Sequence, residues 1–427
     1  MSQVRMLGAL VRSVLVVTPL AGGDATPHPG EPASPPATES AAPTQVLQVR
    51  ARELWTSSGE HLKDALLVIA DGRVRSVSSA GEPDAAQPLV IHTGVVTAGL
   101  IACRSESGTA GELQDDTRSV LSGARAVHAF DPDSRDFERA LSAGITSMVL
   151  APSRENLVGG LACVVKTAGG RVSAPEAGLA LSLTSAALGR SISQGGFLFG
   201  AAEGEGEPLV AGPDGGPEWT SFNTRGTRAP TSYAGALAML KHLFARPEGP
   251  FARAKRGELA VTIEAWDRNE VLRAVQFAQE HKLVGSIRGA PLAGDPEVVA
   301  ALKASGLGVI VGPYSADQTA RSLASVKLLS EAGVAVAFAL DAPVHSPEDL
   351  RLSAARALRS GATRAAVWKA LTEDAARLAG VAETAGSLTP GREADFVLWS
   401  GDPLDLSSHV VAVYVDGRLA WSAPAAR

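Results

Sequence analysis

Histidine and cysteine are the residues best suited to ligate a metal ion, and this chain of 427 residues has only eight histidines and two cysteines. The histidines are His28, His61, His92, His128, His242, His281, His345 and His409. None of them stands in an HxH, HxxxH or HExxH pattern, which would direct two imidazoles at one metal ion. Cys103 and Cys163 form neither a CxxC pair nor a cluster with histidine. The sequence therefore predicts no metal site built from paired histidines or cysteines, and no disulfide framework.

The charge and the composition of the chain narrow the classes of partner. Lys and Arg number 39 and Asp and Glu 45, which gives a formal net charge of −6, and no block of like charges occurs. Because nucleic-acid-binding proteins carry basic patches, we expect no nucleic-acid partner. Hydrophobic residues make up 45% and charged residues 20% of the chain, as in ordinary globular proteins. The chain has no run of about 18 uncharged apolar residues, so we expect no membrane-spanning segment.

The middle of the chain, residues 96–380, alternates strand-like apolar runs with amphipathic helical stretches, which favours βα units around a parallel sheet. Eight strands are predicted, at 100–103, 145–150, 161–166, 178–183, 259–264, 284–288, 308–311 and 334–341. Eight is the number of strands in a (β/α)8 barrel. A helix is predicted from Arg268 to His281, with Asp267 as its N-cap. The Gly-rich segment 187–250 is expected to be an inserted loop over the C-terminal face of the barrel.

Both ends of the chain outside this region show short β-type runs. Strands are predicted near 45–49, 65–69, 74–77 and 90–91, and again at 395–399 and 410–415. We therefore expect one small β-sandwich to which both ends of the chain contribute. The predicted fold class is α/β, a TIM-like (β/α)8 barrel with this composite β-sandwich domain.

The first 45 residues differ in composition from the rest. Arg5 and Arg12 flank and interrupt an apolar stretch that ends at Leu20 and is followed by small residues, a pattern typical of export signals. Residues 24–45 are rich in Pro, Ala, Thr and Ser and are expected to form a disordered linker. We interpret residues 1–23 as an export signal and the protein as periplasmic or extracellular in a bacterial envelope. The alternative is a cytoplasmic protein with a frayed N-terminus.

Several motifs carry a resemblance to a known family. They are TAGLI at 97–101, AGIT at 143–146, GSLTPGREADFVL at 386–398, GDP at 401–403 and VDGR at 415–418. On these motifs the chain resembles the amidohydrolase superfamily, of the imidazolonepropionase-like type, from residue 46 onward. The resemblance implies a metal-dependent hydrolase that acts on carbon–nitrogen bonds of cyclic amides, ureides or peptide-like compounds. We divide the chain accordingly into a barrel at 97–385 and two parts of the β-sandwich at 46–96 and 386–427.

The resemblance further implies a bound zinc or other divalent metal ion, yet most of the expected ligands are missing. The family places an HxH after the first strand, a lysine on the fourth, a histidine at the end of the fifth and of the sixth, and an aspartate after the eighth. The residues at these positions are Arg104 and Glu106, no lysine, Glu264, Arg288 and Asp341. Lys166 lies one strand too early, so only the aspartate is kept. We therefore expect no metal cofactor.

The two arginines among these five residues determine whether the site can bind a metal ion. A guanidinium group stays protonated and offers only hydrogen-bond donors, so it repels a divalent cation instead of ligating it. Two arginines and three carboxylates sum to a formal charge of −1. Adjacent strand ends lie within side-chain reach, so we predict a salt-bridge cluster in which Glu264 pairs with Arg288 and Arg104 with Asp341. Strand alternation predicts that Cys103 points away from this site.

Three functional hypotheses follow, and fold alone does not choose among them. The first is a metal-free pseudoenzyme that binds a small molecule or a partner in the barrel cleft, where the arginines could hold a carboxylate or a phosphate. The second is a divergent hydrolase of non-peptide carbon–nitrogen bonds that uses Glu106, Glu264 and Asp341 as catalytic groups. The third is a structural envelope component that uses the barrel as a scaffold. The interpretation favours the first, and a homo-oligomer is left open.

Overall fold

The computed structural model describes residues 46–424, apart from 112, 114, 116–117, 153, 190–228, 290–294 and 316–317. The predicted export signal and linker lie outside the described residues, as does most of the predicted insertion. In the part that is described, no helix is long and apolar enough to cross a membrane.

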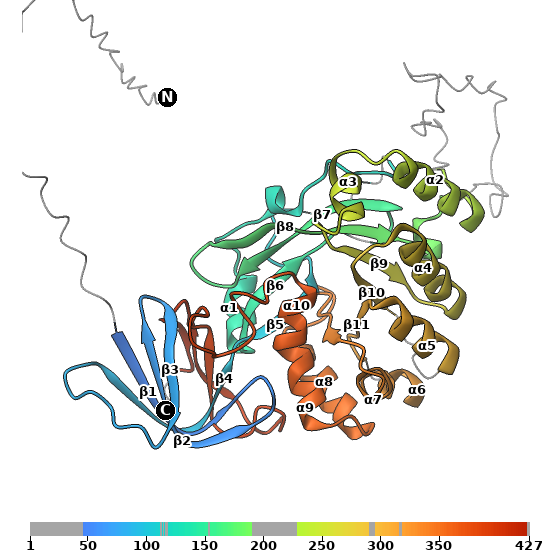
Figure 1. Cartoon of the computed structure of the whole chain (residues 1–427). Coiled ribbons are helices and arrows are strands. Elements are labelled where there is room, and N and C mark those ends of the chain that lie inside the picture. Colours follow the sequence, from blue (N-terminus) through green and yellow to red (C-terminus); the bar gives the residue numbers. More distant parts are fainter. Residues whose placement is uncertain are drawn as a thin grey trace, which may run out of the picture. The chain divides into compact units, whose positions relative to one another are not determined.

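Eight strands form one sheet in the order in which they follow along the chain, and Figure 1 labels the first seven of them, β5 to β11. The eight strands are β5 (Leu100–Ser105), β6 (Ile145–Leu150), β7 (Val158–Lys166), β8 (Val172–Ser182), β9 (Val261–Ala265), β10 (Gly285–Gly289), β11 (Gly308–Val311) and β12 (Val336–Phe338). Each of them overlaps one of the eight predicted strands. The backbone N–H groups of Leu340 and Asp341, just after β12, donate to the carbonyl of Arg104 on β5. The sheet is thus nearly closed, and the predicted barrel class is confirmed.

The expectation of a wholly parallel sheet is wrong at one strand. β7 runs antiparallel to both β6 and β8, whereas the other neighbouring pairs are parallel. The segments that join β7 to its neighbours are 151–157 and 167–171. A parallel crossover needs a dozen or more residues, and connections this short allow only hairpins. The reversal moves Lys166, at the end of β7, to the end of the barrel opposite the carboxyl ends of the parallel strands.

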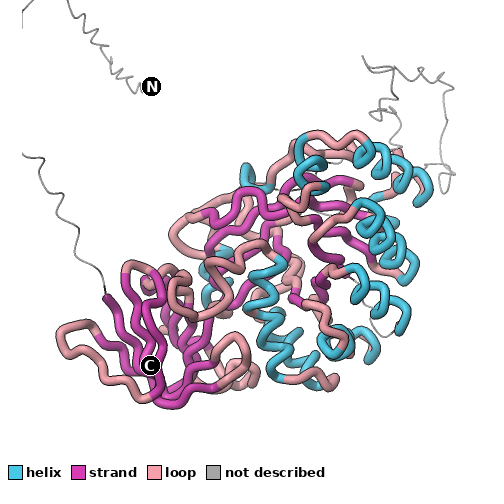
Figure 2. The backbone as a smooth tube through the Cα atoms, in the orientation of Figure 1, coloured by secondary structure: helices cyan, strands magenta, loops and turns pink. Residues whose placement is uncertain are grey.

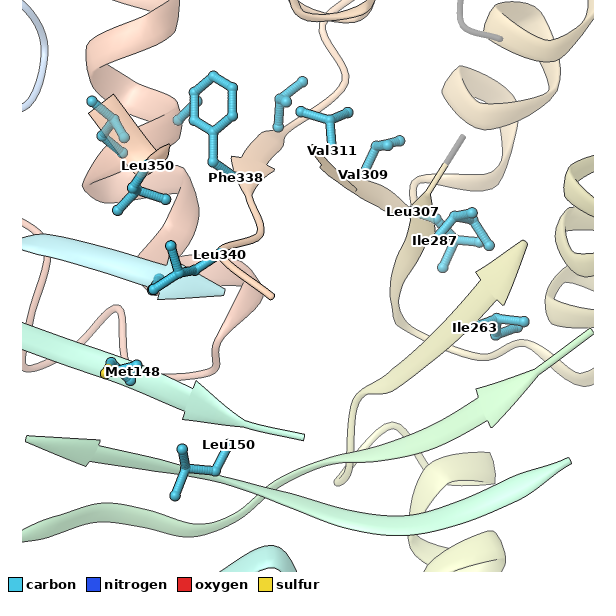
Figure 3. Packing of buried hydrophobic residues seen from close by; sticks show 14 of the residues in the cluster. Met148, Leu150, Ile263, Ile287, Leu307, Val309, Val311, Phe338, Leu340 and Leu350 are labelled. Carbon is cyan, nitrogen blue, oxygen red and sulfur yellow. The ribbon is translucent and has the colours of Figure 1, made fainter. Parts of the chain in front are cut away.

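The barrel strands alternate between two hydrophobic cores. Val309 and Val311 belong to the larger core, which also includes residues of the surrounding helices, and Ile310 between them belongs to a smaller one. Phe338 on β12 follows the same rule, because its neighbours Ala337 and Ala339 belong to the smaller core. Figure 3 shows the larger core along β6 and β9 to β12. This period of two places every second side chain inside the barrel.

Ten helices are described between and after the barrel strands. They are α1 (Asp136–Ser142), α2 (Tyr233–Ala245), α3 (Gly249–Lys255), α4 (Arg268–His281), α5 (Pro296–Ser305), α6 (Ala320–Leu323), α7 (Ser325–Glu331), α8 (Asp349–Arg359), α9 (Arg364–Leu371) and α10 (Glu373–Leu378). α4 has the predicted bounds, and Asp267 caps it as predicted. The described end of the segment 187–250 contains the helix α2 where a loop was expected. Ser232 caps this helix, and Met239, Leu240 and Phe244 are buried on its apolar side.

The two chain ends form a second sheet, as predicted, with the strands shown in magenta in Figure 2. Its seven hydrogen-bonded strands are, in spatial order, β15 (Arg418–Ser422), β14 (Val410–Val415), β13 (Phe396–Trp399), β4 (Leu89–Ala98), β1 (Val46–Trp55), β2 (His61–Ala70) and β3 (Arg73–Ser79). The link between the two chain ends is the antiparallel pairing of β13 with β4. Phe396 and Tyr414 stack in its core with ring centroids 4.4 Å apart.

A group of charges joins this sheet to the barrel, and we call it the junction cluster: the buried Lys166, Glu393 and Asp395 and the partly exposed Arg171 and Asp416. Lys166 Nζ lies 2.7 Å from Glu393 Oε2 and also donates to Asp395. Arg171 Nη2 lies 2.9 Å from Glu393 Oε1 and 2.8 Å from Asp416 Oδ1. Because Lys166 and Arg171 come from the β7–β8 hairpin, these ion pairs attach that hairpin to the carboxyl-terminal strands.

Candidate functional site

The structure brings the five singled-out residues together at the carboxyl ends of the parallel barrel strands. Glu264 on β9 and Arg288 on β10 lie opposite each other in the sheet register. Arg104 lies on β5 and Glu106 directly follows that strand. Asp341 follows β12 with a positive φ of 53°, a conformation that aspartate tolerates better than most residues, and its N–H donates to the Arg104 carbonyl at 3.0 Å.

Ion pairs connect these five residues into one chain, which we call the mouth cluster. Arg104 Nη2 lies 2.8 Å from Glu106 Oε1, and Arg104 Nη1 lies 2.9 Å from Asp341 Oδ1. Arg288 donates to the other oxygen of Asp341, and its Nη1 lies 2.8 Å from Glu264 Oε1. Asp341 therefore bridges the two arginines, and a carboxylate stands at either end.

The mouth cluster is buried deeply enough for its pairing to matter. The side chain of Arg288 is 3% exposed and that of Glu264 8% exposed, whereas Asp341 is 19% exposed. Burial acts to lower the pKa of Arg104, but the carboxylates of Asp341, Glu264 and Glu106 outweigh it and raise that pKa above its ordinary value. Breaking a buried pair by removing one partner typically costs about 3–5 kcal/mol, because the other charge stays buried.

Two residues that the sequence reasoning missed extend the site. The indole N–H of Trp266 donates to Glu264 Oε1 at 3.0 Å. The guanidinium of Arg288 lies 5.0 Å from the centroid of the Trp266 ring, and that of Arg154 lies 5.6 Å from it. Trp266 stands two residues after Glu264, so strand alternation could have placed both on the same side. The position of Arg154, in the loop after β6, had no such signal.

Glu270 holds Trp266 in place. Its Oε2 accepts hydrogen bonds from the backbone N–H groups of Trp266 and Asp267, at 2.8 and 3.2 Å. Its Oε1 accepts from the N–H of Ser185 at 3.2 Å and from the hydroxyl of Tyr233 at 2.5 Å. One buried carboxylate thus ties the loops after β8 and β9 to the start of α2. The capping box of α4, in which Glu270 is the third helical residue, is the sequence signal for this role.

A cavity of about 40 Å³ lies beside the mouth cluster inside the barrel. It is lined by Cys103, Arg104, Val149, Ala151, Pro152, Ala162, Gly178, Ala180, Leu181, Thr262, Glu264 and Arg288. The interior of a (β/α)8 barrel is usually filled by branched side chains, whereas glycine and three alanines stand among these residues. Small side chains on β7 and β8 therefore leave this space.

Cys103 lines the same cavity as Arg104, which corrects the expectation that it points away. The pairing of β5 with β6 shifts register between Ala102 and Ser105, so one extra residue is accommodated on β5. Such a bulge re-aims the side chains within it. Burial raises the pKa of Cys103 to about 12, and its thiol lies 3.5 Å from the carbonyl of Ala375. Cys103 and Cys163 are both free and buried.

The residues present do not fit the divalent metal that the resemblance implies. Both oxygens of Asp341 accept hydrogen bonds from arginines, and Glu264 Oε1 accepts from Arg288 and Trp266. Within the described ranges, no group of three or more His, Cys, Asp or Glu residues is arranged to hold a metal ion. Two guanidinium groups stand where a cation would have to bind, so the donor set suits hydrogen-bonded ion pairs.

Comparison with known proteins relates the carboxyl-terminal part of this chain to a family. Residues 263–420 match the model of the Amidohydrolase family. The amidohydrolase tasK of Hapsidospora irregularis is 23% identical over 381 residues, which cover 77% of this chain and 36% of that protein. The chain thus spans about a third of the length of this curated relative.

Solved structures are similar to the fold as a whole. An amidohydrolase from Thermotoga maritima matches with a TM-score of 0.71 and 22% identity, over 88% of this chain and 100% of that one. Ochratoxinase from A. niger matches with a TM-score of 0.53 and 18% identity, over 90% of this chain and 96% of that one. The family match covers the last barrel strands and the carboxyl-terminal part of the second sheet, and the structural matches extend over both sheets. The chain is thus similar to the amidohydrolase superfamily, by sequence over its carboxyl-terminal part and by fold over both sheets.

Proposed function

We propose that this protein is a metal-free member of its superfamily that binds a ligand or partner at the barrel mouth and does not hydrolyse substrates with a metal-activated water. The observation that carries the proposal is the bridging of Arg104 and Arg288 by Asp341. A hydrolytic zinc site needs neutral imidazoles or carboxylates with free lone pairs and an open position for water. In the mouth cluster those lone pairs accept hydrogen bonds from guanidinium groups.

The free energy of the ion pairs supports the same proposal. A divalent cation at this site would have to displace both arginines from Asp341, and each displaced guanidinium would remain close to the cation. At an effective dielectric constant of about 20, a pair of unit charges about 4 Å apart interacts by about 4 kcal/mol. The loss of these two attractions and the repulsion by the displaced guanidinium groups both oppose metal binding.

The metal content of the full chain tests the proposal. The untagged protein is expressed in medium supplemented with zinc, manganese and iron, and each metal is measured by elemental mass spectrometry against the protein concentration. We expect only background amounts of each metal, both in the wild type and in an Asp341→Asn variant. The reason is that both oxygens of Asp341 in the wild type accept hydrogen bonds from arginines. Near-stoichiometric metal in the wild type that is lost in the variant would overturn the proposal.

The same preparation tests the alternative, a hydrolase of non-peptide carbon–nitrogen bonds that uses Glu106, Glu264 and Asp341. Glu106 is the most exposed of these carboxylates, with a side chain 26% exposed. The wild type and a Glu106→Gln variant are incubated with cyclic amides and ureides, and product is measured by chromatography. We expect no turnover above the uncatalysed rate, and turnover that disappears in the variant would favour the alternative.

A further inference from the structure

We propose that the contact between the ends of α2 and α4 is an acid-sensitive latch, in which protonation of His281 loosens the end of α2 and the helix α3 that follows it. His281 is the last residue of α4. The latch consists of this histidine and the phenylalanines around it, Phe244, Phe251 and Phe277, and Figure 1 labels the three helices that supply them. No residue of the mouth cluster belongs to the latch, so it goes beyond the proposed function.

The imidazole of His281 lies between aromatic rings, with one nitrogen enclosed. Its ring centroid is 5.3 Å from that of Phe244 on α2 and 4.7 Å from that of Phe277 on α4. Phe244 in turn contacts Phe251 on α3, with ring centroids 5.3 Å apart. His281 is partly exposed, but its Nε2 is buried and makes no hydrogen bond within the described part of the chain.

This environment suits a neutral imidazole better than a charged one. A neutral imidazole carries its single N–H on either nitrogen, so Nε2 of His281 can stay unprotonated. The imidazolium carries an N–H on both nitrogens, and the one on Nε2 would point into a place without an acceptor. Burying a charge without a partner costs more free energy than burying a neutral polar atom. Protonation therefore favours any conformation in which the ring reaches water.

The charged groups on all three helices add to this preference. Lys255 on α3 donates to the carbonyl of Phe244 at 3.1 Å, and its ammonium group repels a second cation on His281. Glu280 on α4 attracts the imidazolium, but Lys241 on α2 lies 2.8 Å from this carboxylate. The negative end of the α4 dipole also favours a cation at this position. Burial and the two lysines outweigh these attractions, so the pKa of His281 lies below the ordinary 6.5.

The sign of the pKa shift gives the direction of the response. When the end of α2 moves away, His281 meets water and regains the ordinary pKa of 6.5, so opening takes up a proton at mildly acidic pH. The latch is therefore complete above pH 6.5 and weakens as the pH falls from 6.5 through the lower pKa of the closed form. The start of α2 has a separate attachment, because the hydroxyl of Tyr233 donates to Glu270 at 2.5 Å. Acid should therefore loosen the end of α2 more than its start.

Amide hydrogen exchange of the full chain, read by mass spectrometry of its peptides at about pH 7 and about pH 5, tests the latch. After correction for the intrinsic pH dependence of exchange, peptides from the end of α2 and from α3 should exchange about fivefold faster at about pH 5, because opening takes up a proton. Peptides from α8 should keep their rates. An equal increase in α8 would show acid unfolding of the whole chain, and unchanged rates at the end of α2 would show no latch. Either result overturns the inference.

Two variants of His281 and one matched control assign the effect to this histidine. His281→Phe keeps a ring between Phe244 and Phe277 and takes up no proton, so the end of α2 should exchange slowly at both pH values. His281→Arg carries a permanent charge and should exchange fast at both. His242→Gln removes an exposed histidine in the last turn of α2 and should follow the wild type. A pH effect that persists in His281→Phe, or one that disappears in His242→Gln, would overturn the inference.

Discussion

The molecule holds two clusters with the same charges in different surroundings. The mouth cluster and the junction cluster each combine two cations with three carboxylates. In the junction cluster, Lys166 is 1% exposed and lies between the barrel and the second sheet. In the mouth cluster, Arg104 and Arg288 border a cavity to which no residue of the junction cluster contributes. Charge composition therefore does not separate a structural cluster from a candidate binding site, whereas the presence of an adjacent cavity does.

The two clusters also differ in the cation that they use. Both cations at the mouth are arginines, whose planar groups each donate to two carboxylates. The most buried cation in the junction cluster is Lys166, a compact charge that forms ion pairs with Glu393 and Asp395. Arginine keeps its proton at every accessible pH, but lysine does not. The clusters should therefore respond differently to truncation and to pH.

The largest effect is expected from Lys166→Met. This change leaves Glu393 and Asp395 buried, and only Arg171 remains near Glu393. Leaving buried charges without their partner typically costs about 3–5 kcal/mol, and we expect the upper end of this range. Urea unfolding followed by circular dichroism measures the free energy of unfolding. A loss below about 1 kcal/mol would place the junction cluster among the weak surface pairs.

A smaller loss of about 3 kcal/mol is expected from Glu264→Ala. Arg288 then loses one carboxylate but keeps Asp341, and the indole of Trp266 loses its acceptor. Glu264→Gln is the matched variant, because its amide oxygen still accepts both hydrogen bonds, so its loss should be roughly half as large. The thermal midpoints of both variants measure the difference. An unchanged midpoint for Glu264→Ala would count against a buried, mutually paired mouth cluster.

The mouth cluster could be predicted from the sequence to a larger extent than the junction cluster. Arg104, Glu264 and Arg288 were singled out because the family's metal-ligand positions, which the resemblance implies, fall at the ends of strands that the alternation of apolar residues predicts. Eight strands and the composite second sheet followed from the same alternation and from turn residues. Such signals are local, and they fix which side chains reach the carboxyl ends of parallel strands.

The rest depended on contacts between distant parts of the chain. Lys166 and Asp395 are 229 positions apart, and only the reversal of β7 brings them together. Helical and strand periodicity do not reveal the direction of a strand; the short connections on either side of β7 do. Trp266 and Arg154 meet at a ring face, a contact that leaves no spacing pattern in the sequence. The bulge on β5 that lets Cys103 and Arg104 line the same cavity leaves none either.

An effect of intermediate size is expected from alkaline pH, which should reduce the stabilisation by the junction cluster and leave that by the mouth cluster unchanged. Burial acts to lower the pKa of Lys166, but Asp395 and Glu393 outweigh it and raise that pKa above the ordinary 10.5. A raised pKa means that the stabilisation is complete below about pH 10.5 and is lost as the pH rises through the folded value. The pKa of Arg104 is raised from an already higher value, so the mouth cluster keeps its cations throughout.

Unfolding free energies measured between about pH 8 and about pH 11 test this difference. The wild type should lose stability toward the alkaline end, and Lys166→Met should lose less over the same interval because it has no lysine to deprotonate there. Glu264→Ala should follow the wild-type curve at a lower level. Parallel curves for the wild type and Lys166→Met would assign the alkaline loss to other groups.

The smallest effect is expected at an ion pair with good geometry but no burial. Arg50 donates to Asp64 through Nε at 2.9 Å and through Nη2 at 2.6 Å, a two-pronged contact with one carboxylate, whereas each arginine at the mouth divides its donors between two. The side chain of Asp64 is 53% exposed, so water solvates either charge when its partner is removed. Asp64→Asn should therefore leave the urea midpoint unchanged within error. A shift as large as that of Glu264→Ala would show that geometry, and not burial beside a cavity, sets the strength of the ion pairs in this protein.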